Sequence, residues 1–287
     1  MNSPDYAQAI MNSGLPYKEQ LVELVRPAVF ARSGPASHQK PPAGMSRLGG
    51  LPDLPSGIQW PVWQGKPQSF VAQINLSELP DLTERHLLPA QGWLFFFYDA
   101  AQSTTGLYRS ERESFKVIYA PEVGQAAETP LASDKSGEVA LFHPRSLSFS
   151  VGNSEPGWEH PALERLGLSF EECLAYADVV RRAEVDPTMR GPGRHQILGY
   201  PSPLQTPVAL DCERAQQDYW NLDRAQRAAL NPRLSEHVDD WVLLLQVDGD
   251  PDANIAWPGS GRLYYLIRRQ DLIRRAFDQA WVVLQST

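Results

Sequence analysis

The acidic stretch from Asp248 to Asn254 is the part of the chain whose residue types and spacing come nearest to a known kind of site. It places oxygen-bearing side chains at every second position, as the first half of an EF-hand calcium loop does. However, Ala253 stands where such a loop needs glycine, and Gly259 stands where it needs a bidentate glutamate. The spacing therefore excludes an EF-hand. It leaves open whether the loop binds a cation or is a solvated turn, and we assign no metal site.

His195 is the candidate general base. It opens the stretch His195–Pro201, which has apolar residues around it, but no carboxylate or nucleophile lies at a telling spacing. A structural histidine is one interpretation, and a hydrolase or transferase centre around His195 and Asp248 is the other. We favour the first, assign no catalytic residue and no cofactor, and expect a protein that is not an enzyme.

Other motifs that carry chemistry do not occur in the chain. Cys173 and Cys212 are too few for a disulfide framework in 287 residues. The Gly191–Gly193 segment lacks the Lys-Ser/Thr pair of a phosphate loop, and no Gly-x-Ser-x-Gly elbow occurs. His143, His160 and His237 have no metal-ligand spacing.

Charge and hydropathy narrow the classes of partner. A formal net charge of −8 argues against nucleic acid and anionic membranes, which attract basic proteins. The first residues lack the basic and apolar regions of a secretory signal, and no apolar run is long enough to span a membrane. We therefore expect a cytoplasmic protein whose partner, if it has one, is a basic protein.

Two apolar hairpins organise the chain. One runs from Trp241 to Ile267 and a weaker copy runs from Phe70 to Tyr98. They align through Gln73-Ile74-Asn75 with Gln246-Val247-Asp248, and each continues through Pro-x-x-Gly into a second apolar strand. Upstream, Leu48–Asp53 is similar to Ile197–Ser202. We therefore predict an internal duplication, with a helical insertion in the second copy.

Strand parity puts an amide and a second polar group on one face in each copy. Gln73 shares a face with Asn75, and Gln246 shares one with Asp248. One interpretation is that the amides bind the backbone of the neighbouring Gly/Pro segments. The alternative is that these four side chains line a groove between the copies and bind a ligand or a partner.

The remaining elements follow from spacing and helix breakers. In chain order they are helices over 4–13 and 17–26, a strand over 29–31, a mobile loop over 33–45, an irregular segment over 46–66, strands over 115–119, 139–142 and 147–151, a helix over 169–183, a polar helix over 213–230 ended by Asn231-Pro232, a helical turn over 271–273 and a strand over 281–284.

These elements predict an α+β, mainly β fold, with roll-like antiparallel sheets built from two pseudo-repeats and with peripheral helices. We expect residues 1–45 to form N-terminal helices and the mobile loop, and residues 46–287 to form one domain. Within it, repeat one covers about 46–151, a helical insert about 160–190, and repeat two about 195–287.

Several of these motifs, in this order, resemble the YwqG-like family of bacterial proteins. They are Gly-Gly-Leu-Pro-x-Leu-Pro from Gly49, Ala72–Leu76, Leu88-Pro89-x-x-Gly92, His195-Gln196-x-x-Gly199-Tyr200-Pro201, Leu244–Asp248, Trp257, Gly261–Tyr264 and Asp271-Leu272. The resemblance implies a mainly β, roll-like fold and brings no activity. It also implies an accessory or immunity role beside contact-dependent toxin systems, by association and not by mechanism.

Three functional hypotheses follow. The first is a non-enzymatic binding protein, in the immunity or accessory role, with a toxin-like protein partner. The second is a small-molecule or peptide-binding module, and the third is the enzyme around His195. Trp257 lies in a Pro-containing irregular segment, where aromatic residues often anchor partners. The residues we assign to ligand or partner binding are Gln73, Asn75, His195, Gln246, Asp248, Trp257 and Arg262.

Overall fold

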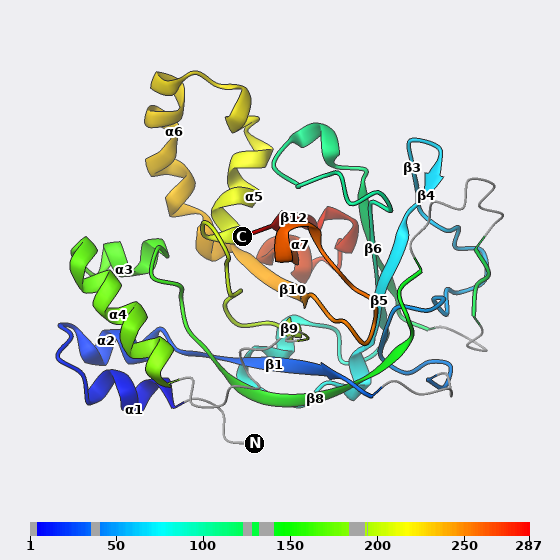
Figure 1. Ribbon diagram of the computed structural model, residues 1–287, viewed down its shortest axis with the longest axis horizontal. Helices are drawn as coiled ribbons and strands as arrows, with labels where there is room; N and C mark the ends of the chain where they lie inside the picture. The colour runs from blue at the N-terminus through cyan, green and yellow to red at the C-terminus, as the bar shows by residue number, and fades with distance from the viewer. Residues whose placement is uncertain (1–4, 36–40, 123–127, 132–140, 184–192, 194) are drawn as a thin grey trace.

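A ten-stranded antiparallel sheet forms the centre of the protein (Figure 1). The computed structural model describes residues 5–35, 41–122, 128–131, 141–183, 193 and 195–287. Its strands run in the order β12-β11-β10-β9-β1-β8-β2-β5-β6-β7. Their bounds are β1 Arg26–Ser33, β2 Arg47–Leu48, β5 Ser69–Asn75, β6 Trp93–Tyr98, β7 Phe115–Ala120, β8 Arg145–Ser154, β9 His195–Ile197, β10 Trp241–Asp248, β11 Arg262–Arg268 and β12 Trp281–Gln285. The expected mainly β, α+β class is confirmed.

The strand order reads as two equivalent halves. Four strands, β2, β5, β6 and β7, follow one another on one side of the central pair, and β9, β10, β11 and β12 do so on the other. The hairpin β5–β6 pairs Gln73 with Phe95, and β10–β11 pairs Gln246 with Tyr264. Each hairpin also has a bulge at the same place, between Phe70 and Ala72 and between Leu243 and Leu245. The two pseudo-repeats are thus present in register as well as in order.

The amide hydrogen bonds repeat too. The Gln73 side-chain oxygen accepts from the Asp53 amide at 3.0 Å, and the Gln246 oxygen accepts from the Ser202 amide at 2.9 Å. Asp53 and Ser202 occupy equivalent positions, six residues after Arg47 and Gln196 in the paired strands. The two glutamines therefore bind the backbone of the Gly/Pro segments, which have few ladder partners of their own.

The central pair shows that the halves are intertwined. β1 precedes the first set of strands but pairs with β9 of the second, while β8 precedes the second set and pairs with β2 of the first. β1 and β8 pair with each other over their whole length, from Arg26 opposite Ser154 to Ser33 opposite Leu147. The two halves have thus exchanged their first strands with each other. The N-terminal region therefore contributes a central strand of the sheet, residues 26–33, in addition to the expected helices. Residues 36–40 of the loop predicted to be mobile lie outside the described residues.

Aromatic packing brings the two ends of the sheet together. Phe96 on β6 meets Tyr265 on β11 edge-on at 5.0 Å, and Phe115 on β7 meets Trp281 on β12 at 5.4 Å. The Leu284 amide of the edge strand β12 donates to the Thr105 carbonyl at 2.9 Å. The sheet is therefore nearly closed on itself around one apolar core.

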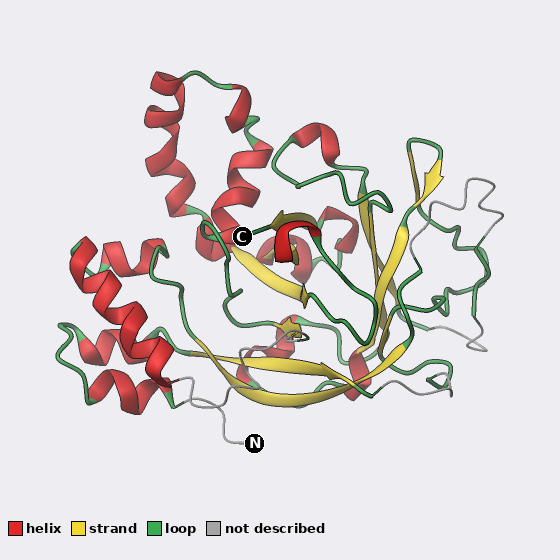
Figure 2. Cartoon of the chain, in the orientation of Figure 1, coloured by secondary structure: helices red, strands yellow, loops and turns green. Residues whose placement is uncertain are grey.

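Helices gather at two places beside the sheet (Figure 2). The helices α1 (Tyr6–Met11), α2 (Lys18–Glu23), α3 (Pro161–Arg165) and α4 (Phe170–Ala183) share their own apolar cluster. A second pair, α5 (Val208–Gln216) and α6 (Arg224–Glu236), is inserted in the chain between strands β9 and β10. At the equivalent place in the chain, between β2 and β5, repeat one has the small hairpin of β3 (Val62–Trp63) and β4 (Lys66–Pro67). A short α7 (Arg269–Ile273) follows β11. No helix in the described ranges has the length and apolar character that crossing a bilayer requires.

The predicted single helix over 213–230 is wrong. The first helix ends at Gln216, and a capping box at Asp223, with Gln226 as its reciprocal partner, starts a new one. Pro232 does not end that helix, which continues to Glu236. Proline leaves the Ala228 carbonyl without its helical donor, and because Ala228 is exposed, water can satisfy it.

The strand predicted over 139–142 is also wrong in its described part, since Leu141 and Phe142 have no strand assignment. Residues 139 and 140 lie outside the described residues. The Phe142 carbonyl instead accepts from the Gly50 amide at 2.8 Å, and Phe142 packs edge-on against Trp257. Phe142 is therefore a buried core residue that lies in a loop and not in a strand.

The repeated amide gives a matched pair of substitutions. Gln73→Leu removes hydrogen bonds to the Asp53 amide, the Asp53 carboxylate and the Met45 carbonyl, whereas Gln246→Leu removes the bond to the Ser202 amide. Because each buried group left unpaired costs about 1–3 kcal/mol, we expect Gln73→Leu to lower the free energy of unfolding by about 2–3 kcal/mol and Gln246→Leu by about 1 kcal/mol. Urea titrations of both variants measure this, and equal losses would contradict the prediction.

Candidate functional site

Gln73 and Asn75, which we assigned to a groove, are engaged within their own half. Gln73 is fully buried and binds the segment around Asp53. The Asn75 side chain donates to the Gly44 carbonyl at 3.0 Å and accepts from the Ser77 amide at 3.0 Å. Neither residue belongs to the lining of the cavity described below, and Gln246 does not belong to it either.

Asp248 and Arg262, by contrast, lie on the wall of a cavity. The Arg262 guanidinium forms an ion pair with Asp248 at 3.0 Å and donates to the Ser202 carbonyl at 2.6 Å. The neighbouring Tyr264 hydroxyl donates to the same carbonyl at 2.8 Å. These contacts hold the segment after Gly199 against β11.

His195 is fully buried, and both ring nitrogens are used. Nδ1 accepts from the Asp248 amide at 3.3 Å, so the proton lies on Nε2, which faces the Asp250 carboxylate at 3.3 Å. Burial alone would raise the pKa of Asp250, but hydrogen bonds from His195, Ser33 and the Ala253 amide hold this pKa well below its usual value. His195 and Asp250 thus fix the acidic loop in place.

The carboxylates of that loop do not converge. Asp250 accepts from the amides of Asp252 and Ala253, and Asp248 is paired with Arg262. No group of three or more His, Cys, Asp or Glu side chains suited to a metal ion occurs within the described ranges. Trp257 lies at the end of the loop and belongs to the core: it is 4% exposed, donates to the Val247 carbonyl and meets Tyr98 edge-on.

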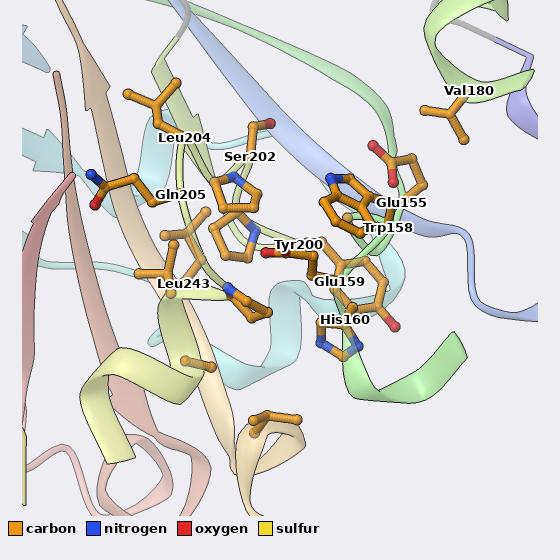
Figure 3. A pocket seen from close by; sticks show the side chains of 18 of the residues that line it. Glu155, Trp158, Glu159, His160, Val180, Tyr200, Ser202, Leu204, Gln205 and Leu243 are labelled. Atoms are coloured by element: carbon orange, nitrogen blue, oxygen red, sulfur yellow. The ribbon is translucent and has the colours of Figure 1, made fainter. Parts of the chain in front are cut away.

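The cavity that contains Asp248 and Arg262 has a volume of about 420 Å³ (Figure 3). It lies between helix α4, the connection from β8 to α3, the segment after β9, and the strands β10 and β11. Trp158, His160 and Tyr200 stand together on one side of it, and Leu204 and Gln205 stand on the other. A cavity of this size is within the usual range for small-molecule sites, which is about 300–1,000 Å³.

The duplication explains why there is space here. In repeat one the outer face of the hairpin carries the pair Phe70 and Phe97, whose rings lie 5.5 Å apart, and Trp60 packs on Phe97 at 5.6 Å. At the equivalent positions of repeat two the paired residues are Leu243 and Leu266, which line the cavity. The second half therefore has smaller side chains where the first has an aromatic plug.

One wall of the cavity is held from behind. The segment Pro201–Pro207 contains three prolines, and its amides at Leu204 and Gln205 both donate to the Gln285 side chain, at 2.9 and 3.2 Å. The Gln285 nitrogen in turn donates to the Thr206 carbonyl at 2.8 Å. Because proline and these bonds fix the backbone, the wall is preformed.

The opposite wall carries polar groups with few partners. The Arg26 guanidinium lies 4.4 Å from the centre of the Tyr200 ring, and the His160 ring meets the same ring edge-on at 5.2 Å. Tyr200 is 5% exposed, and its hydroxyl has no hydrogen-bond partner in the part of the chain that is described. Burial is the main cause that raises the pKa of this hydroxyl, so it stays protonated.

His160 is neutral at physiological pH. Burial, together with the positive charges of Arg165 and Arg26, lowers its pKa to about 4 against the opposing charge of Asp239. Its Nδ1 accepts from the Ala162 amide at the start of α3, so Nε2 carries the proton. The imidazole is therefore a fixed hydrogen-bond donor.

This histidine predicts a pH dependence of stability. Its folded-state pKa lies below the unfolded value of about 6.5, so the unfolded chain binds more protons between these values. The contribution of this histidine to stability is fully present above about pH 6.5 and falls as the pH drops toward 4, by about 3 kcal/mol. His160→Asn keeps an N-cap acceptor but cannot titrate. Urea titrations at pH 7 and pH 5 should show a smaller loss for this variant, and an equal loss would refute the assignment.

Asp248 and Arg262 were predicted as binding residues from the sequence, whereas the residues across the cavity from them were not. Trp158 and His160 belong to the connection from β8 to α3, which has no periodic pattern. Tyr200 was recognised only as a member of the His195–Pro201 motif and was not assigned to the site. The usable signal was the alignment of the repeats, because extending it three residues back from Gln73 and Gln246 sets Phe70 against Leu243.

A family model described as a domain of unknown function, DUF1963, matches residues 46–286. The matched stretch contains both hairpins and every residue of the cavity wall except Arg26. No curated protein matches the chain.

Proposed function

The chain belongs to the DUF1963 family, whose domain has no known function, and we propose that it is a non-enzymatic binding protein for a small molecule or a short peptide. Family membership brings no activity with it, so the proposal rests on the cavity. The observation that carries the proposal is the replacement of the aromatic plug of repeat one by Leu243 and Leu266 in repeat two. Folding alone would favour filling that space, because packed aromatic side chains stabilise a core. The preformed wall also supports a binding site, as does the Tyr200 hydroxyl, which has no hydrogen-bond partner in the described ranges.

A binding role rather than a catalytic one is supported by the engagement of His195 and Asp250. Both are buried, and both hold the acidic loop through the bonds described above. A general base needs a path to its substrate. The imidazole of His160 does face the cavity, and we assign it the part of a hydrogen-bond donor.

The cavity-filling variant Leu243→Phe/Leu266→Phe tests the proposal. It copies the pair found at the equivalent positions of repeat one, so we expect it to fold, with a change in the free energy of unfolding below about 3 kcal/mol. In a thermal-shift screen of metabolites and short peptides, a ligand at about 100 times its Kd stabilises the wild type by about 2.7 kcal/mol. The filled variant should lose that stabilisation.

Two results would count against the proposal. One is a screen in which nothing stabilises the wild type. The other is a set of ligands that stabilise the filled variant as well as the wild type, since they would bind elsewhere. Phe70→Leu/Phe97→Leu is the matched control, because it makes the reciprocal exchange in repeat one and leaves the cavity untouched.

A second candidate, a protein partner, is favoured by an apolar surface beside the cavity. Phe170 at the start of α4 is 67% exposed and packs edge-on against Trp158, and Leu174, one turn later, is 45% exposed. Glu171 and Glu172 lie between them on the helix, so a basic partner would be complementary. The resemblance to the YwqG-like family extends this candidate to an immunity or accessory protein that binds a toxin.

The products of neighbouring genes are the natural partners to try. Capture of one of them by the wild type but not by Phe170→Ser/Leu174→Ser would support the second candidate. If no neighbouring product binds, this candidate is lost and the first is unaffected. Cys173 and Cys212 are free thiols, which supports our further proposal of a reducing, cytoplasmic location.

A further inference from the structure

An arginine that has no counter-ion among the described residues lies on the wall of the cavity. Arg26 is half-buried, and within the described ranges its guanidinium has the Tyr200 ring as its neighbour but no ion-pair partner. The Tyr200 hydroxyl beside it is buried and also without a partner there. We propose that this wall binds a carboxylate of the ligand, with Arg26 supplying the charge and the Tyr200 hydroxyl and His160 Nε2–H supplying hydrogen bonds.

Desolvation is the physical reason. Taking a guanidinium partly out of water is unfavourable unless an anion compensates, and a buried hydroxyl without a partner costs free energy too. In a chain with a net charge of −8, carboxylates are plentiful, yet none of the described ones is paired with Arg26. A bound carboxylate would satisfy both groups at once, since guanidinium and carboxylate form strong paired hydrogen bonds.

The same cavity also offers negative charge. Glu155 and Glu159 belong to its lining, near Trp158 (Figure 3). Glu155 accepts from the Tyr176 hydroxyl at 3.4 Å. Partial burial raises the pKa of Glu159. The charge of Arg214 lowers this pKa and the charge of Asp211 raises it, so a cation beside Glu159 would stabilise the ionised carboxylate.

A ligand with both charges fits this wall better than an anion alone. The space of about 420 Å³ and the apolar floor of Leu243 and Leu266 suit a short peptide with free termini, its carboxylate at Arg26 and its ammonium toward Glu159. This inference rests on the proposed function and adds the chemical class of the ligand to it.

Native mass spectrometry of the full chain with three pools of randomised tripeptides tests the assignment. One pool has free termini, one is amidated at the C-terminus and one is acetylated at the N-terminus. Loss of a charge-assisted bond to arginine should weaken binding about 10-fold or more for the amidated pool. We expect a smaller loss for the acetylated pool. Equal binding of the free and amidated pools would overturn the carboxylate site.

Two variants separate binding from folding. Arg26→Met should lose the preference for the free carboxylate while its Tm stays within about 3 °C of the wild type. Tyr200→Phe removes a hydroxyl that has no hydrogen-bond partner among the described residues, so its Tm should not fall, whereas its affinity should. If no pool binds while other screened ligands still distinguish the wild type from Leu243→Phe/Leu266→Phe, this inference fails and the proposed function stands.

Discussion

Replacing Arg47 with methionine is expected to lower the free energy of unfolding by about 3–5 kcal/mol, because it leaves a buried carboxylate unpaired. Arg47 and Asp53 are 2% and 0% exposed, and two guanidinium nitrogens meet the two Asp53 oxygens at 2.8 and 2.9 Å. The Gly44 amide and the Gln73 side chain also donate to Asp53. Equilibrium urea unfolding at pH 7 measures the loss.

The equivalent residue of repeat two provides the control. Gln196 pairs with Gln246 as Arg47 pairs with Gln73, and its side-chain nitrogen donates to the Leu198 and Tyr200 carbonyls. Gln196→Met leaves no charge behind, so we expect a loss of about 1–2 kcal/mol. A loss as large as that of Arg47→Met would mean that the unpaired Asp53 carboxylate is not the cause of the large loss of stability in repeat one.

The pH dependence of Arg47→Met follows from the same pair. Burial would raise the pKa of Asp53, but hydrogen bonds from Arg47, Gly44 and Gln73 outweigh it and lower this pKa below its usual value. The stability from this depressed pKa is therefore present above the unfolded pKa of about 3.9 and is lost as the pH falls through the lower folded value. Without Arg47 the sign should change, and the variant should regain part of its loss toward pH 4.

The duplicated hairpins could be predicted from the sequence because their signals are local. Gln73 and Gln246 interrupt apolar strands at the same position, and the Gly/Pro turns that they bind recur at matching offsets. Alternation of side chains and turn residues fixes such hairpins without reference to the rest of the chain. The helix over 170–183 was predictable for the same reason, since the Ser169–Glu172 capping box marks its start.

The exchange of β1 and β8 could not be predicted, because local patterning does not say which strand pairs with which. Residues 26–33 and 145–154 are compatible with either half, and only the assembled sheet puts β1 beside β9 and β8 beside β2. The cavity escaped prediction for a related reason. Arg26, Trp158 and Tyr200 come from three distant segments, and their meeting depends on that exchange, since Arg26 opens β1.

Gly106 is the residue at which the sheet is closed, and the sequence gives it no special mark. Its carbonyl accepts from the Trp281 indole at 2.8 Å, and the neighbouring Thr105 carbonyl accepts from the Leu284 amide. The Glu111 carboxylate accepts from the Gly106 amide at 2.6 Å, which fixes the turn from the other side. The loop therefore occupies the free edge of β12, an edge that would otherwise be open to another chain.

Gly106→Ala is expected to lower the free energy of unfolding by about 4 kcal/mol or more, because two costs add. The φ angle is +74°, which side chains rarely adopt, and a Cβ would lie 1.7 Å from the Val282 carbonyl oxygen, so the backbone of β12 would have to move. Gly65→Ala isolates the first cost, since Gly65 has a φ of +77° but no atom of the described residues within 4 Å of a Cβ. We expect that control to lose about 1–2 kcal/mol. Thermal and urea unfolding compare the two variants. If Gly106→Ala loses no more than Gly65→Ala, then β12 is not held against this loop, and the sheet is open at that end.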